Sequence, residues 1–160
     1  MQTFLPHQSF RDSASVLDTK RLGKQRVECL QILRALTGKS KGWVSHPATK
    51  MWKGYELALA EYSLCIIDEW LARGYKDTCR DKIFKGSRDR LCELMVMPPW
   101  WGREDIHSSH RSNLLRKDPK HYKQFGWTEF CWILGRFPIL YKSINCPRCQ
   151  CIMELLCDYC

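Results

Sequence analysis

The sequence predicts a mainly α-helical protein, made of one compact helical domain and a small C-terminal zinc knuckle. Apolar side chains recur at helical spacing in several long stretches. An apolar content of 44%, with 12% aromatic residues, is typical of a folded chain. Five of the ten cysteines crowd the last fifteen residues. We therefore place the helical domain at residues 1–142 and a cysteine-rich zinc-binding tail at residues 143–160.

Residues 17–36 form the best-defined predicted helix. We expect Asp12 or Ser13 to cap it and Gly38 to end it. At 100° per residue, its apolar side chains share one side: Leu22, Cys29, Leu33 and Leu36. Polar side chains share another: Arg21, Lys24, Glu28 and Gln31. A basic stripe with one carboxylate suits a site that binds phosphates and does chemistry, although a plain solvent-exposed face is the alternative.

Three further helices are expected along the chain. The second, over residues 48–73, starts after Pro47 and has an apolar stripe that predicts core packing: Met51, Tyr55, Leu59, Tyr62, Ile66 and Trp70. A less regular helix is expected over 76–97, and another over 103–117. The block Pro98-Pro99-Trp100-Trp101 lies between these last two helices and cannot itself be helical at its prolines. Its tryptophans would either insert as a wedge at a disturbed DNA base step or be buried in the protein core. Residues 128–141 are apolar and end in a strand-like FPILY.

The charge balance favours an anionic partner. The formal net charge is +9, and double-stranded DNA is the partner we expect first. No apolar run approaches the roughly 20 residues needed to cross a membrane. The N-terminus lacks the features of a signal peptide, so the cysteines are expected to be reduced. These observations predict a protein of the cytoplasm or nucleus without a membrane partner. We separately expect a monomer, and a phage or viral gene is one source that we consider.

The cysteine tail has the spacing of a metal site. Two CxxC pairs offer four thiolates, the usual set for a tetrahedral structural zinc: Cys146, Cys149, Cys157 and Cys160. Cys151 is an additional thiol that could replace one ligand. Unligated thiols or a redox pair are the alternatives.

A second basic region begins within the fourth predicted helix and continues beyond it. His107 and His110 stand three residues apart, and are expected to contact phosphates or to be bonded internally more than to hold a metal. Positive and aromatic side chains then alternate, as in a segment that binds a DNA backbone: Arg111, Lys117, Lys120 and Tyr122. A solvated face over an aromatic core is the alternative.

Three motifs together resemble the pyrimidine-dimer DNA glycosylase family of the phage endonuclease V type. They are LDTKRLGKQRVE in the first helix, WLARGY at the end of the second, and the closing HSSHRSNLLRKDPKHYKQFGW. The resemblance covers roughly residues 1–127 and implies a compact, mostly helical protein. It also implies excision of a damaged or modified pyrimidine, followed by cleavage of the strand at the abasic site.

The resemblance assigns roles to individual residues. An N-terminal amine attacks the sugar carbon C1′ and forms an imine, and a glutamate on the first helix, here Glu28, assists. Arg21, Lys24 and Arg26 would hold the neighbouring phosphates. No cofactor is expected for this chemistry.

The identity of the amine is an open point. An α-amine has a pKa near ~8, against ~10.4 for lysine, and so is far more often unprotonated at neutral pH. Gln2 is too bulky for ordinary removal of the initiator methionine, so Met1 itself would supply the amine. Lys20 or Lys24 is the alternative. The competing hypothesis for the whole protein is a non-catalytic nucleic-acid-binding protein with a zinc knuckle.

Overall fold

The computed structural model describes residues 2–87 and 94–129. Within these ranges the chain is helical and contains no strand. The elements are α1 (Phe10–Ser15), α2 (Thr19–Leu36), α3 (Pro47–Trp52), α4 (Glu56–Ala72), α5 (Arg80–Ser87), α6 (Glu104–Lys117), α7 (Pro119–Tyr122) and the 3₁₀ turn η2 (Lys123–Phe125). The expected mainly α-helical class is confirmed for this part of the chain. The four zinc ligands, Cys151 and the FPILY segment lie outside the described residues.

The predicted start of the first helix is wrong, because the structure has two helices, α1 and α2, where the sequence predicted one continuous helix. Ser9 caps α1 and accepts a hydrogen bond from the Asp12 amide at 3.2 Å. Asp18 then adopts an extended conformation and caps α2, accepting from the Arg21 amide at 3.0 Å. Helical periodicity alone does not reveal this break, since Leu17 between the two helices is apolar and fully buried. The predicted end at Gly38 agrees with α2 to within two residues.

The second and third predicted helices are also shorter than expected. Gly54 has a φ of 86°, which separates α3 from α4 within the range predicted as one helix. Further along, α5 begins only at Arg80, after Asp77 accepts hydrogen bonds from the Cys79 and Arg80 amides, each at 2.8 Å. Residues 94–98 are not helical. The fourth predicted helix is confirmed as α6.

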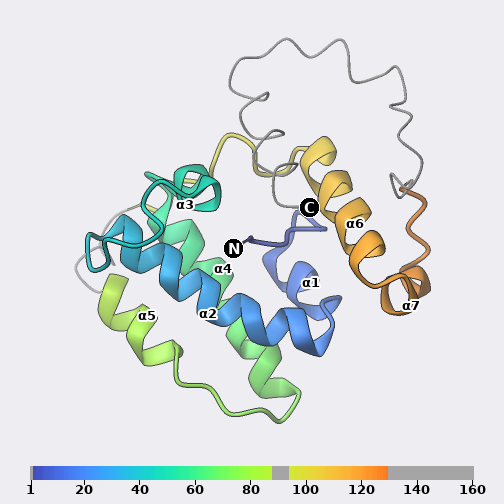
Figure 1. Cartoon of the computed structure of the whole chain (residues 1–160), viewed down its shortest axis with the longest axis horizontal. Coiled ribbons are helices and arrows are strands. Elements are labelled where there is room, and N and C mark those ends of the chain that lie inside the picture. The colour runs from blue at the N-terminus through green and yellow to red at the C-terminus, as the bar shows by residue number, and fades with distance from the viewer. Residues whose placement is uncertain (1, 88–93, 130–160) are drawn as a thin grey trace.

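The core lies where α2 packs on α4, with α1 and α5 at its borders (Figure 1). The predicted stripe is confirmed: Leu59, Tyr62 and Ile66 are fully buried, and the other three pack against them. Gly23 allows the close approach of the helices, because a Cβ atom there would lie 2.9 Å from the Trp70 ring.

The Pro-Pro-Trp-Trp block contributes to packing. Trp100 is buried and meets the ring of Trp52 edge-on, with centroids 4.9 Å apart. Trp101 is half-buried and its indole donates to the Gln8 carbonyl at 3.0 Å. Of the two alternatives, the structure therefore has buried packing. Among the described helices, none is long and apolar enough to cross a membrane.

Candidate active site

The N-terminal segment, residues 2–7, lies in the middle of the fold, and its first residues lie beside α2 (Figure 1). Side chains, not a neighbouring strand, satisfy its backbone. Gln25 of α2 donates from Nε2 to the Gln2 carbonyl at 2.8 Å and accepts from the Phe4 amide at 3.2 Å. One glutamine side chain thus binds the segment much as a paired β-strand would.

Helices α3 and α4 hold the same segment from another side. The Tyr62 hydroxyl donates to the Phe4 carbonyl at 2.7 Å. The Trp52 indole donates to Thr3 Oγ1 at 3.0 Å. All four residues are buried. Because a buried polar group without a partner is costly, these bonds fix the path of the segment.

Helix α6 provides the third wall. His107 Nδ1 lies 2.8 Å from the Leu5 carbonyl, and Arg111 donates to the Pro6 carbonyl at 2.8 Å. The Arg111 guanidinium also pairs with Glu104 and Glu129. The segment is therefore anchored residue by residue, by side chains from four different helices.

The anchored segment leads directly to Glu28. The Gln2 amide donates to Glu28 Oε2 at 3.4 Å, and Lys24 Nζ lies 3.6 Å from Oε1. Glu28 is only 8% exposed, whereas the Lys24 side chain is 72% exposed. Asn113 of α6 donates to the Gln2 side chain at 3.3 Å. A nearly buried carboxylate, a surface cation and the beginning of the chain thus meet at one place; Met1 lies outside the described residues.

Several of the predicted DNA-binding cations lie on one side of the Glu28 site. Arg21 stands about two turns from Glu28 on α2 and binds Asp18 at 2.6 Å. It also approaches Asp118 to 3.7 Å, at the turn that carries the exposed Lys117 and Lys120. The structure therefore brings residues from both ends of the domain to the same border of α2.

The carboxyl group of Asp18 binds both Arg21 of α2 and Tyr122 of α7 at this edge of α2. Burial opposes its ionisation, but hydrogen bonds from the Tyr122 hydroxyl and Arg21 hold its pKa below the ordinary value. Burial and the bond to Asp18 in turn raise the pKa of Tyr122. Tyr122 is fully buried, so its observed role is to fasten α7 to the start of α2.

Two predicted phosphate-binding arginines have structural partners instead. Arg26 pairs with Asp77 and lies over the Trp70 ring, 4.4 Å from its centroid. Arg111 pairs with Glu104 and Glu129. Their side chains are only 13% and 12% exposed, respectively. Each stabilises the fold, and a role in DNA binding stays an untested prediction for both.

The two histidines of α6 are internal. His107 and His110 are 2% and 1% exposed. Burial lowers the pKa of His110 to about 3, and neither of its ring nitrogens has a hydrogen-bond partner among the described residues. No group of three or more metal-ligating side chains occurs in the described ranges. Of the alternatives, the geometry favours bonded or buried histidines over phosphate ligands.

Sequence reasoning missed the residues that position the segment. Gln25, Trp52 and Tyr62 resemble ordinary helix residues, and nothing in their spacing marks them as partners of the N-terminus. The one available signal was Pro6, which excludes a helix at the start of the chain and leaves an extended segment in need of hydrogen-bond partners.

Comparison with known proteins supplies one match. A sequence profile of the family described as pyrimidine dimer DNA glycosylase matches residues 1–83, just over half of the chain. The match includes the N-terminal segment, Gln25 and Glu28. Neither the curated proteins nor the solved structures contain a significant match.

Proposed function

Because this chain belongs to the pyrimidine dimer DNA glycosylase family, we propose that it excises a damaged pyrimidine and then cleaves the abasic strand. The family is one of DNA glycosylases, so DNA is the substrate. The single observation that supports the site is the approach of the Gln2 amide to the Glu28 carboxylate, at 3.4 Å.

The α-amine of Met1 is the proposed nucleophile. The Gln2 nitrogen that faces Glu28 is the atom bonded to residue 1, so covalent geometry limits the Met1 amine to about one residue's length from it. The amine nitrogen attacks C1′, the bond from C1′ to the base breaks, and its electron pair leaves with the base. Loss of the amine proton and opening of the sugar ring give an imine. Removal of a C2′ proton then expels the 3′ phosphate, which cleaves the strand.

Glu28 is the proposed electrostatic and proton-transfer group. Its carboxylate lies in a nearly buried position, where the effective dielectric constant is low and a negative charge stabilises a cationic sugar or imine strongly. The anchoring of residues 2–7 holds the Gln2 amide beside Glu28 before DNA binds, which limits the freedom of an amine on the preceding residue and so reduces the entropic cost of the attack.

The decisive experiment removes this charge. Glu28→Gln keeps the size of the side chain and much of its hydrogen bonding. Excision under single-turnover conditions should fall by ~10²-fold or more, while DNA affinity stays equal or rises because a negative charge is lost. Glu61→Gln makes the same change at an exposed position of α4 and is the matched control. A folded Glu28→Gln protein that excises at the control rate would refute the assignment.

Borohydride trapping distinguishes an enzyme from the non-catalytic nucleic-acid-binding protein. Reduction of an imine joins the protein covalently to DNA, and a protein that only binds gives no adduct. Mass spectrometry of the trapped peptide should identify Met1. An adduct on Lys20 or Lys24 would keep the lyase chemistry but assign it to a lysine.

We also propose that the protein acts as a monomer on double-stranded DNA, held by the cations near Glu28: Arg21, Lys24, Lys117 and Lys120. Binding should weaken steeply with added salt, because each phosphate contact releases counterions. Affinity that does not depend on salt would argue against backbone binding.

The zinc knuckle remains a proposal from the sequence. Purified protein should contain about one equivalent of zinc, and Cys149→Ser should reduce it while the helical domain stays folded. Less than half an equivalent, unchanged by Cys149→Ser, would remove the proposal.

A further inference from the structure

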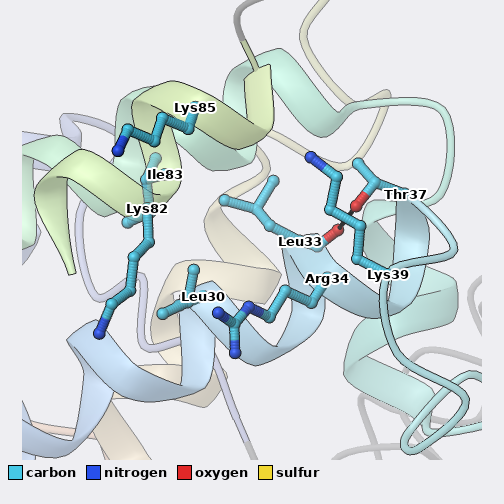
Figure 2. A pocket seen from close by; sticks show the side chains of 8 residues that line it. All are labelled: Leu30, Leu33, Arg34, Thr37, Lys39, Lys82, Ile83 and Lys85. Atoms are coloured by element: carbon cyan, nitrogen blue, oxygen red, sulfur yellow. Dashed lines mark hydrogen bonds between the residues drawn. The ribbon is translucent and has the colours of Figure 1, made fainter.

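A hollow lies between the C-terminal half of α2 and α5, away from Glu28. Its volume is about 200 Å³. Figure 2 shows how apolar side chains from both helices lie at its floor while longer basic side chains surround it. The floor is formed by Leu30, Leu33 and Ile83, and the rim by Thr37, Arg34, Lys39, Lys82 and Lys85. We call this hollow the α2–α5 pocket.

The charge at this pocket has one sign. Arg34, Lys39, Lys82 and Lys85 are all exposed, and none forms an ion pair with a described residue. No carboxylate of the described residues belongs to the lining. This differs from the predicted arginines Arg26 and Arg111, whose charges are neutralised within the fold.

The end of α2 does not cancel this charge. The carbonyl groups at a helix C-terminus carry partial negative charge when they lack partners. Here the Leu33 carbonyl accepts from the Thr37 amide at 3.0 Å and from its hydroxyl at 2.8 Å. The Arg34 carbonyl accepts from the Ser40 amide at 3.1 Å. An anion in the pocket therefore meets four cations and few free acceptors.

The pocket and Glu28 lie at opposite borders of the exposed face of α2. At 100° per residue, Glu28 and the pocket residue Leu30 differ by about 200° around the helix axis. On the solvent side, the arc between them includes the partly buried Gly23, the buried Ala35 and five exposed residues, none of which is acidic: Lys20, Lys24, Val27, Gln31 and Arg34. A continuous neutral-to-basic ridge thus connects the two places.

The width of α2 corresponds to a few nucleotides of duplex DNA. A helix with its side chains is about 10–12 Å across, and successive phosphates of one strand are ~3.4 Å apart along the duplex axis. A duplex that presents a base at Glu28 and lies across α2 would therefore reach the pocket about three nucleotides away.

We propose that the α2–α5 pocket binds a backbone phosphate of the DNA that flanks the damaged base. The rim cations bind the phosphate oxygens, and the apolar floor contacts the adjoining deoxyribose. This inference rests on the proposed function, since it takes Glu28 as the position of the damaged base.

The test compares two double variants of equal charge. Lys82→Gln/Lys85→Gln removes two rim cations, whereas Lys53→Gln/Lys76→Gln removes two exposed lysines that do not line the pocket. The affinity for an undamaged 20-base-pair duplex is measured at several salt concentrations, and thermal unfolding verifies that both variants are folded.

The pocket variant should bind ~10-fold more weakly than the control variant at low salt, with a salt slope smaller by about 1 to 2. Equal affinities and equal slopes for the two variants would overturn the inference. Excision by the wild-type protein is measured separately. If the wild-type protein binds DNA but excises nothing, the proposed function fails, while the difference between the two variants still decides whether the pocket holds DNA.

Discussion

The N-terminal segment and the α2–α5 pocket use polar side chains in opposite ways. Around residues 2–7, donors and acceptors are paired within the protein, including the guanidinium of Arg111. In the pocket, the four cations have no ion-pair partner among the described residues. Internal pairing fixes a position, whereas unpaired charge remains available for a ligand.

The contrast explains why positive charge alone is a poor guide to DNA contacts in this chain. Arg26 and Arg34 lie on the same helix, about two turns apart, yet Arg26 is paired with Asp77 while Arg34 is exposed. Substitutions in the first region should therefore change stability and geometry. Substitutions in the second should change DNA binding and leave the free energy of unfolding nearly unaltered.

The largest expected loss of stability follows Arg111→Ala. Removing this guanidinium leaves the Glu129 carboxylate and the Pro6 carbonyl without their partner, so the free energy of unfolding should fall by about 2–3 kcal/mol. Arg34→Ala, which breaks no ion pair within the described residues, should change it by no more than ~0.5 kcal/mol. Chemical denaturation of both variants measures the difference, and equal losses would contradict the contrast.

A somewhat smaller loss is expected for Gln25→Leu. The Gln2 carbonyl and the Phe4 amide would lose their partner, at a cost of ~2 kcal/mol in unfolding free energy. Because the segment would then be less well positioned, excision should also slow by ~10-fold with little change in DNA affinity. Gln31→Leu, at an exposed position of α2, is the control. A normal excision rate in folded Gln25→Leu would show that the anchor does not position the nucleophile.

The third effect concerns pH. Burial lowers the pKa of His110 to about 3, so between that value and ~6.5 the unfolded chain binds the additional proton. Above pH ~6.5 the neutral His110 therefore does not lower the free energy of unfolding, and as the pH falls below that value the free energy of unfolding decreases by up to ~1.4 kcal/mol per pH unit. His7 and His46, whose pKa values are also lowered by burial, act in the same direction.

His110→Leu should make the unfolding free energy less dependent on pH between about 7 and 5. Denaturant titrations at several pH values measure this slope for the wild type and the variant. An unchanged slope would mean that His110 is not the group responsible.

The smallest change in stability is expected for Lys82→Gln/Lys85→Gln. Removing unpaired like charges should leave the unfolding free energy within ~0.5 kcal/mol, with any gain greatest at low salt. Thermal unfolding at low and high salt checks this. A large destabilisation would mean that these lysines have partners within the fold.

Local signals in the sequence predicted much of the fold. The apolar stripe of α4 and the extent of α6 are confirmed, because burial of one helix face dictates residue type at a regular spacing. The helix breaks at Asp18 and Gly54 were not predicted. The buried Leu17 and Trp52 come just before these breaks, so the apolar spacing continues through a change in direction that only packing requires.

For the site, the sequence by itself determined which chemical groups are present. It set one carboxylate, Glu28, within the basic stripe of the first helix, an extended start of the chain before Pro6, and a positive net charge. Only the tertiary structure decided which groups meet. Residues 2–7 reach Glu28 because side chains from α2, α3, α4 and α6 form hydrogen bonds to their backbone and side chains, and those contacts join residues 21 to 111 positions apart. The same packing neutralised Arg26 and left Arg34 exposed, since an ion pair depends on which carboxylate the fold brings within reach.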